Sequence, residues 1–271
     1  MAEDRLASAQ TMKLSLAGWS LNERFMQKRN ALRLLDFPKV ARSRFGIDAI
    51  EPNNIFFEST TLKYLRELKK CARNEGVSIL NIAVDEPFDM CQGGWLGRRA
   101  VNGYAWWIPI AAELGCTAIR ANSGGGDARS YSSAQFQACA DNFANLADRA
   151  RPLGIRIVME NHWGLSGDPD RMLKVRKMSS NAFDFLVDFG NWPKTLDRYA
   201  ALEKIMPYAH AVHAKIYQID ANGRHPSFNL GRCVQIAKSA GYDGFLGIEY
   251  EGGGNQDEGV RRAMRELKKF I

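Results

Sequence analysis

The chain repeats one pattern eight times: a short run of β-branched or apolar residues is followed by a stretch with the composition of a helix. Alternating strands and helices predict a parallel sheet covered by helices. Eight such units close into a (β/α)8 barrel, which has ~250 residues in typical cases, and this chain has 271. We therefore expect a single TIM-barrel domain over residues 1–271, with about residues 1–12 as an N-terminal extension.

The predicted strands and helices account for almost the whole chain. The first four strands are expected at residues 13–17, 46–51, 77–84 and 116–121, and the last four lie in the runs IRIVMEN, FDFLVDFGN, AHAVHAK and FLGIEYEGG. The helices are expected at residues 31–44, 60–74, 99–114, 132–151, 169–178, 195–206, 227–240 and 257–270. The connection after the third strand, residues 85–95, is longer than usual and predicts a lid or a wall of the substrate site.

Four residues close the last four strand runs, namely Glu160, Asp188, His213 and Glu249. In a closed barrel the carboxyl ends of all strands meet at one face, where side chains distant in sequence converge. Two glutamates, an aspartate and a histidine at that face predict an open site for one divalent metal ion. Any one strand-end carboxylate could be a structural hydrogen-bond acceptor, but four such residues at the same end of consecutive strands favour the metal site.

The predicted ligand set suits a hard divalent cation. Carboxylate oxygens favour Mn²⁺ or Mg²⁺, and one imidazole among three carboxylates shifts the preference toward Mn²⁺, with Co²⁺ or Zn²⁺ as further alternatives. A cation chelated by the carbonyl and the neighbouring hydroxyl of a sugar acidifies the adjacent C–H and stabilises the enediolate that forms when the proton leaves. The site then needs only a base near that carbon.

On four motifs the chain resembles the sugar phosphate isomerase/epimerase superfamily, which has a xylose-isomerase-like TIM barrel. This superfamily includes ketose 3-epimerases, hydroxypyruvate isomerase, inosose dehydratase and, more distantly, endonuclease IV. The motifs are MEN around Glu160, VDFGN around Asp188, HAK around His213 and GIEYEG around Glu249, and the similarity covers essentially the whole chain. The resemblance implies that these four residues bind one metal ion, with Glu160 and Glu249 as the candidate acid and base.

One position departs from the pattern of the ketose 3-epimerases. That family typically has a histidine three positions after the aspartate ligand, where this chain has Asn191. An asparagine can hydrogen-bond a substrate hydroxyl but cannot transfer a proton at neutral pH. His162 follows Glu160 by two residues and would share its side of the strand if the strand continued that far, so His162 is a further candidate acid or base.

Other side chains near the strand ends are predicted to contact the substrate. Lys215 shares the face of His213 and could neutralise an enediolate, the alternative being an ion pair with a ligand carboxylate. Arg120 and Glu51 end earlier strands and are expected to hold sugar hydroxyls, with Lys215 as another partner for Glu51. Trp19 could pack on a sugar ring, and plain wall packing is its alternative.

Three functions are compatible with this site. The first is a metal-dependent isomerase or epimerase of a keto sugar or related polyol, acting through a cis-enediolate. The second is a metal-dependent lyase or dehydratase that uses the same site for inosose dehydration or for β-elimination from a 3-keto-glycoside. The third is a module that binds metal and sugar without catalysis. The ligand set and the resemblance favour the first function.

Charge distribution limits the macromolecular partners. The net charge of +7 comes from lysines and arginines spread along predicted helices, for example at residues 63–73 and 261–269, which indicates a solvated outer face and no nucleic-acid binding. A trinuclear site like that of endonuclease IV is not expected, because all four histidines, at positions 162, 210, 213 and 225, fall on later strands and loops.

The apolar pattern and the cysteines of the sequence indicate where in the cell the protein is expected. No apolar run approaches the ~20 residues of a spanning helix, and the first ten residues lack the apolar stretch of a signal peptide. The five cysteines show no paired spacing and are interpreted as reduced thiols. We expect a cytoplasmic protein with a small-molecule carbohydrate substrate and no membrane partner, although a leader removed before residue 1 would leave no trace. A homo-oligomer is compatible with the sequence.

Two further features receive structural interpretations. The glycine clusters at residues 124–126 and 252–254 match no nucleotide-binding motif and are interpreted as turns rather than phosphate cradles. His225, in the loop after the seventh strand, is interpreted as a solvated histidine.

Overall fold

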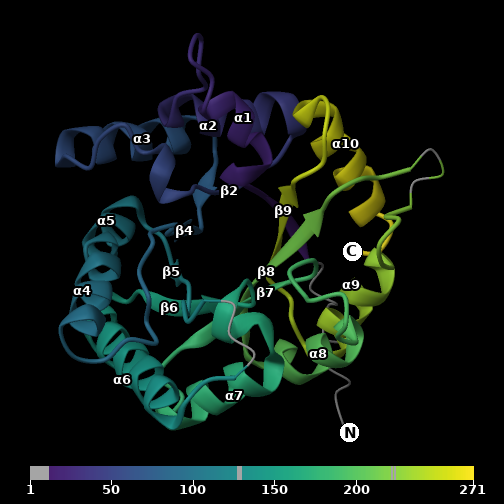
Figure 1. Cartoon of the computed structure of the whole chain (residues 1–271). Coiled ribbons are helices and arrows are strands. Elements are labelled where there is room, and N and C mark those ends of the chain that lie inside the picture. The colour runs from purple at the N-terminus through teal and green to yellow at the C-terminus, as the bar shows by residue number, and fades with distance from the viewer. Residues whose placement is uncertain (1–11, 127–129, 221, 223) are drawn as a thin grey trace, which may run out of the picture.

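The computed structural model describes residues 12–126, 130–220, 222 and 224–271. Within them, one sheet of nine parallel strands runs in the order β3-β2-β1-β9-β8-β7-β6-β5-β4. The strands form an inner ring, and the helices lie around its outside (Figure 1). The predicted (β/α)8 barrel is therefore confirmed.

The strands bring the predicted site residues to one end of the ring. Their bounds are β1 (Lys13–Ala17), β2 (Ala49–Glu51), β3 (Ser78–Ile79), β4 (Asn81–Ala83), β5 (Ala118–Ala121), β6 (Arg156–Glu160), β7 (Asp184–Asp188), β8 (Ala209–Ile216) and β9 (Phe245–Tyr250). Glu160 and Asp188 are the last residues of β6 and β7, and His213 and Glu249 lie in the carboxyl-terminal halves of β8 and β9. All four residues therefore lie at or near the carboxyl ends of their strands.

The third predicted strand, residues 77–84, is divided into β3 and β4 at Leu80. The Leu80 N–H donates to the carbonyl of Ile50 in β2, whereas the Leu80 carbonyl accepts from the N–H of Thr117, which precedes β5. Leu80 thus transfers the hydrogen-bond ladder from one neighbour to the other. A parallel bridge between Asn53 and Ala83 links the segment after β2 to β4. Because β3 and β4 together correspond to the third predicted strand, the eight predicted strands account for all nine observed ones.

Most helices begin and end close to their predicted positions. The longer ones are α3 (Leu62–Asn74), α4 (Gly94–Ala105), α5 (Trp107–Leu114), α6 (Ser133–Ala150), α7 (Pro169–Met178), α8 (Arg198–Ile205), α9 (Leu230–Ser239) and α10 (Gln256–Leu267). Side-chain caps set several of these starts: Ser132 accepts from Gln135 N before α6, and Asp168 accepts from Arg171 N before α7. Such caps satisfy backbone N–H groups that have no partner within the helix.

The predicted helix over residues 31–44 is observed as consecutive helical turns of three kinds over residues 34–45. This region forms a 3₁₀ turn (Leu34–Asp36), the short helix α2 (Phe37–Val40) and a π turn (Ala41–Phe45). Pro38 lies at the start of α2. Because proline has no N–H and its ring clashes with the preceding turn, it is tolerated only in the first turn, which prevents α2 from extending toward the N-terminus.

The predicted helix over residues 99–114 is observed as two helices. Pro109 cannot donate a hydrogen bond to residue 105, and its ring crowds the carbonyl there, so α4 ends at Ala105 and α5 begins at Trp107. The α4 helix also begins earlier than predicted, at Gly94. The connection after the third strand is consequently shorter than the sequence suggested.

Apolar side chains form two separate buried clusters. The large cluster draws on both strands and helices and fills the layer between them. The small cluster consists of Ala118, Val158 and Leu186, with Ala211 packed against it. Each of these four residues precedes a polar site residue by two positions, the pairs ending in Arg120, Glu160, Asp188 and His213. Because strand side chains alternate between faces, the polar residues lie inside the barrel above this apolar floor.

Three smaller predictions concern the N-terminus, membrane-spanning helices and the cysteines. The expected N-terminal extension lies outside the described residues except for Met12, which is buried. Among the described helices, none is long and apolar enough to cross a membrane. All five cysteines are free, as their irregular spacing predicted.

His225 is buried, not solvated as predicted. Only 7% of the residue is exposed, its Nε2 accepts from Tyr217 N at 3.3 Å, and its ring packs against Phe228 with centroids 4.1 Å apart. Burial, and then the positive charge of Arg198, lower the pKa of His225 to about 4. The folded protein therefore holds His225 in its neutral form.

We expect this histidine to make folding stability depend on pH. The unfolded chain takes up a proton at His225 near the ordinary pKa of ~6.5, whereas the folded protein does so only near a pKa of about 4. The contribution of His225 to the free energy of unfolding should be fully present above pH ~6.5 and should be lost progressively as the pH drops toward 4. Urea unfolding across this range should show a shallower pH dependence for His225→Gln, and equal slopes for variant and wild type would contradict the expectation.

Candidate metal centre

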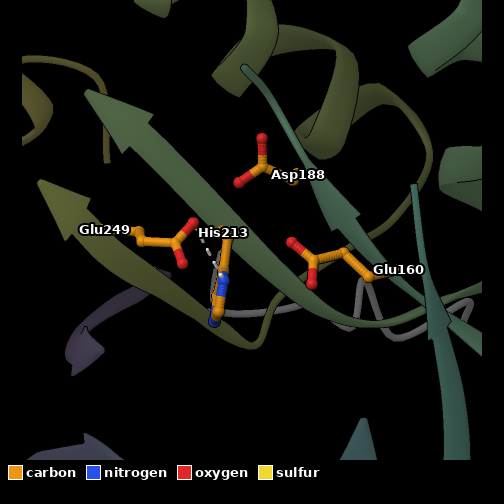
Figure 2. A group of neighbouring side chains, drawn as sticks. All are labelled: Glu160, Asp188, His213 and Glu249. Carbon is orange, nitrogen blue, oxygen red and sulfur yellow. Dashed lines mark ion pairs between the residues drawn. The ribbon is translucent and has the colours of Figure 1, made fainter. Parts of the chain in front are cut away.

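Glu160, Asp188, His213 and Glu249 meet at the carboxyl ends of four consecutive strands. One ligand atom from each residue lies within 4.8 Å of the others, and all four residues are buried. The carboxyl groups of Glu160 and Glu249 stand on opposite sides of the His213 ring (Figure 2). Ligands on opposite sides of one cation are ~4 to 5 Å apart when metal–oxygen bonds are ~2.0 to 2.6 Å, so the spacing fits a single ion.

Three of the ligand atoms are buried without a hydrogen-bond partner, namely Asp188 Oδ2, His213 Nδ1 and Glu249 Oε2. Buried polar atoms are normally paired, and each exception requires a physical explanation. Two carboxylate oxygens and one imidazole nitrogen within one cluster are atoms that a divalent cation would satisfy. The residues present therefore fit one divalent ion.

Asp188 is oriented by the backbone that follows it. Its Oδ1 accepts from the N–H groups of Gly190 at 2.6 Å and Asn191 at 2.7 Å. Its Oδ2 is left for the cluster. The turn after β7 thus determines which carboxylate oxygen is available.

Glu160 is held at both oxygens, at one by a hydrogen bond and at the other by an ion pair. Asn191 Nδ2 donates to Glu160 Oε1 at 3.0 Å, and Arg120 Nε lies 2.9 Å from Glu160 Oε2. Arg120 is itself fixed by the Val84 carbonyl at 3.0 Å and by Asp85 Oδ1 at 2.7 Å. The structure therefore places Asn191 and Arg120 against a predicted ligand, and their contact with substrate stays a prediction.

The outer nitrogen of His213 lies against Glu51. His213 Nε2 is 2.9 Å from Glu51 Oε2, while His213 Nδ1 is 3.6 Å from Glu249 Oε2. Glu51 also accepts from Ser15 Oγ at 2.5 Å and from Asn81 Nδ2 at 2.6 Å. A carboxylate at the outer nitrogen of a metal-binding histidine fixes its tautomer and ring orientation. Glu51, only 3% exposed, therefore lies behind His213, and its contact with a sugar hydroxyl stays a prediction.

Gly247 makes room for the contact between Glu51 and His213. It pairs with His213 in the register of β8 and β9. A Cβ at this position would lie 2.6 Å from Glu51 Oε1 and 2.7 Å from His213 Cδ2, closer than real atoms approach. Any side chain here would displace one of the two residues.

Lys215 makes the ion pair that was the alternative to a substrate contact. Its Nζ lies 3.1 Å from Glu249 Oε2 and 3.1 Å from Glu251 Oε1, and the residue is 2% exposed. Gly190 leaves space for its stem, since a Cβ there would lie 2.8 Å from Lys215 Cβ. Lys215 thus brings a buried positive charge beside a predicted ligand.

Burial and mutual charge shift the pKa values in the cluster in opposite directions. Burial, opposed by Lys215 but reinforced by Glu249 and Glu160, raises the pKa of Asp188 well above its usual value. Burial also acts to raise the pKa of Glu249, but Lys215 and His213 outweigh it and lower that pKa well below its usual value. Carboxylates crowded in this way repel one another and attract a cation.

His162 and Trp19 have other neighbours than those expected. Because β6 ends at Glu160, the condition under which His162 would share the face of Glu160 is not met. The His162 N–H donates to Ser166 Oγ at 3.3 Å, and its ring Nδ1 is buried without a partner. Trp19 is half-buried and stacks on Phe56 with ring centroids 6.2 Å apart. Their roles toward a substrate stay predictions.

The glycines after β5 are tied to a carboxylate. The Gly125 N–H donates to Asp89 Oδ1 at 2.9 Å, and the Cys91 N–H donates to the same oxygen at 2.8 Å. A negative charge therefore already occupies the backbone N–H that a phosphate would need, which supports the interpretation of this cluster as a turn.

Three supporting residues were absent from the sequence prediction, namely Ser15, Asn81 and Asn161. Ser15 and Asn81 are isolated polar residues in the short apolar strands KLSLA and NIA. Asn161 belongs to the MEN motif, but only its glutamate was given a role. For Ser15 and Asn81 the available signal was a polar residue within a short apolar strand, whereas Asn161 follows the end of β6 and gave no such signal.

The barrel and its site match one known family. A model of the family described as "Xylose isomerase-like TIM barrel" matches residues 40–270. The chain belongs to this family. The four clustered residues all lie within the matched region.

Two curated relatives share short stretches of sequence with the chain. It is 40% identical over 65 residues to a "C-glycoside deglycosidase alpha subunit" from Arthrobacter globiformis, over 24% of this chain and 18% of the relative. It is 44% identical over 48 residues to a "3'-dehydrocarminate deglycosidase alpha subunit" from Microbacterium, over 18% of this chain and 14% of the relative. The matches therefore span less than a fifth of each relative's length.

Solved structures share the fold across nearly the whole chain. An L-ribulose 3-epimerase superposes with a TM-score of 0.78 at 13% identity, over 96% of this chain and 94% of its own. A xylose isomerase-like TIM barrel protein from Mycobacterium smegmatis, solved in complex with magnesium, superposes with a TM-score of 0.70 at 18% identity, over 96% of this chain and 97% of its own. At these identities the likeness concerns the fold.

We expect Glu51→Gln to lower the affinity for Mn²⁺ by about 10- to 100-fold, because the carboxylate that orients a histidine ligand is lost. Isothermal titration calorimetry of the metal-stripped protein measures this affinity. Asp257→Asn is the control, since Asp257 is a partly buried carboxylate of α10 that is paired with Arg24 at 2.8 Å and lies outside the cluster. Equal Mn²⁺ affinity in Glu51→Gln and wild type would remove the proposed role of Glu51.

Proposed function

We propose that the protein is a divalent-metal-dependent lyase that releases the aglycone of a 3-keto-glycoside by β-elimination. The observation that carries this proposal is that both curated relatives described above are named deglycosidases. The motifs alone placed an isomerase or epimerase first, and elimination second. The buried ligand cluster supports either reaction, because both begin with removal of a proton next to a carbonyl.

The contacts of the two glutamates favour a single proton acceptor. Glu160 Oε1 accepts a hydrogen bond from Asn191 Nδ2, and Glu160 Oε2 forms an ion pair with Arg120 Nε. Glu249 Oε2 likewise forms an ion pair with Lys215 Nζ at 3.1 Å, but Glu249 accepts no hydrogen bond from the described residues. A carboxylate that binds a cation through one oxygen and accepts no hydrogen bond has its other oxygen available for a substrate proton. Elimination needs one such acceptor, so Glu249 is the proposed base.

In the proposed reaction, Glu249 accepts the proton from C2, which is adjacent to the C3 carbonyl. The C2–H electron pair moves into an enolate and then forms the C1–C2 double bond as the C1–aglycone bond breaks. The aglycone leaves with that bonding pair and takes up a proton, for which His162 is the proposed donor. A bound divalent ion would polarise the carbonyl and stabilise the negative charge that develops on its oxygen. Lys215 and Arg120 add fixed positive charge beside the same cluster.

Mn²⁺ is the proposed ion. Within the four clustered residues, Asp188 and Glu249 each have a buried oxygen without a hydrogen-bond partner, and His213 supplies one such nitrogen, Nδ1. An oxygen-rich set with one imidazole fits Mn²⁺ and Mg²⁺ better than the softer ions, with the imidazole favouring Mn²⁺. Co²⁺ and Zn²⁺ serve as comparisons in the binding measurements.

A second candidate is the isomerase or epimerase of a keto sugar, favoured by the positions of Glu160 and Glu249 on opposite sides of His213 (Figure 2). Epimerisation requires proton removal on one face of a carbon and proton return on the other. Two carboxylates across the cluster could perform these two transfers. The donors on Glu160 argue against this role but do not remove the carboxylate from the site.

One assay separates these functions. Mn²⁺-loaded protein is incubated in deuterated buffer with 3-keto-glycosides and with free keto sugars, and products are identified by mass spectrometry and NMR. Free aglycone together with an unsaturated keto sugar supports the lyase. Deuterium in an intact sugar without loss of aglycone supports the isomerase or epimerase. Binding of metal and sugar with no C–H exchange would leave only the binding module.

We expect Glu249→Gln to lower turnover by about 10² or more while substrate binding largely survives, because glutamine keeps a ligand oxygen but cannot accept the proton. Turnover and bound Mn²⁺ are measured on the same samples, since loss of metal alone would abolish activity. Glu251→Gln is the matched control, as it removes the same charge from the other partner of Lys215. Near-normal turnover by a metal-replete Glu249→Gln protein would exclude this base, and His162→Asn would be tested next.

A further inference from the structure

The sheet opens between the strands that carry Glu160 and Asp188. Paired residues of β6 and β7 end with Glu160 beside Leu186, although β7 continues to Asp188. Beyond this point the Asn161 side chain replaces the strand. Asn161 Oδ1 accepts from Asp188 N at 2.7 Å, and Asn161 Nδ2 donates to the Asp188 carbonyl at 2.9 Å. One carboxamide thus continues the ladder by satisfying both backbone groups of a predicted ligand.

A second asparagine makes the reverse connection. Asn191 follows β7, and its N–H donates to Asp188 Oδ1 at 2.7 Å while its Nδ2 donates to Glu160 Oε1 at 3.0 Å. Asn161 therefore reaches from the Glu160 strand to the Asp188 backbone, and Asn191 reaches from the Asp188 turn to the Glu160 carboxylate. The two connections cross the same opening in opposite directions.

We propose that Asn161 and Asn191 form a reciprocal clamp that sets the spacing between Glu160 and Asp188 and thereby determines how tightly the cluster binds its metal ion. Both are positioning residues, since they act through the ligands. The inference rests on the proposed metal-dependent function. It gives Asn191 a role different from contact with a sugar hydroxyl.

Burial makes the clamp strong. Asn161 is completely buried, as is Asp188, so the two hydrogen bonds between them are shielded from water. Removing the Asn161 carboxamide would leave the Asp188 N–H and carbonyl without partners in the interior, and such groups pull the backbone toward other partners. Asp188 Oδ2 would then move relative to Glu160. Metal ions tolerate ligand displacements of only a few tenths of an ångström.

The clamp is tested by the Mn²⁺ affinity of Asn161→Ala, Asn191→Ala and the double variant. Each single substitution should weaken Mn²⁺ binding by about 10- to 100-fold, the range seen for groups that orient ligands. The double variant should lose less than the product of the two single losses, because both residues control the same spacing. Free Mn²⁺ is counted by electron paramagnetic resonance during titration, which requires no substrate and no turnover.

Asn142→Ala is the matched control. Asn142 Nδ2 also donates to two backbone carbonyls, those of Met90 and Gln92, both at 2.9 Å, but it belongs to α6. Its replacement should lower the melting temperature of the metal-stripped protein without changing Mn²⁺ affinity. A purely structural role for Asn161 and Asn191 would give the same result as this control.

The outcomes separate the clamp from the function on which it rests. If wild-type protein binds no Mn²⁺, the proposed metal-dependent function fails. If wild type binds Mn²⁺ and both asparagine variants bind it equally well, the clamp is overturned while the metal site stands. If Asn161→Ala does not fold, Asn191→Ala decides alone: a tenfold or larger loss supports the clamp, and unchanged affinity overturns it.

Discussion

An eight-stranded barrel has room inside for only a few side chains at each level, and this steric limit positions the whole site. Ala118, Val158 and Leu186 fill one level, and the next inward residues on the same strands are polar. The intervening residues point outward and pack under the helices. The same short strands therefore supply both the hydrophobic core and the reactive groups, and the alternation of side chains keeps the two apart.

A polar barrel interior is stable here because nearly every buried charge has a counterpart. Arg120 faces Glu160 and Asp85, Lys215 faces Glu249 and Glu251, and Glu51 faces His213. An uncompensated buried charge would cost several kcal/mol, in rough terms, so the loss of one member of such a pair is more damaging than the absence of both. Three of the buried atoms that stay without hydrogen-bond partners, on Asp188, His213 and Glu249, lie in the cluster, where a cation would complete the balance.

Strand order and the four clustered residues could be predicted because both follow from a short sequence repeat, a strand followed by a helix. In a closed barrel this repeat determines where the end of each strand lies. The contacts around the cluster could not be predicted from the sequence. Glu51 was placed correctly at its strand end, but only the register across the four strands β2, β1, β9 and β8 shows that it faces His213. The position of His162 could not be predicted, because nothing local indicates that β6 stops at Glu160. His225 looked solvated because its burial comes from Phe228, which belongs to the packing of the following helix.

Gly247 shows that the geometry of the four clustered residues depends on a further position. The volume occupied by Glu51 and the His213 ring exists only because the neighbouring strand carries no side chain at that register. A designer who grafted the two glutamates, the aspartate and the histidine onto another barrel would reproduce the donor atoms but not the space behind the imidazole. A complete description of this centre therefore includes Gly247 together with the four clustered residues. A search for similar centres in other barrels should require a glycine at this register as strictly as it requires the two glutamates, the aspartate and the histidine.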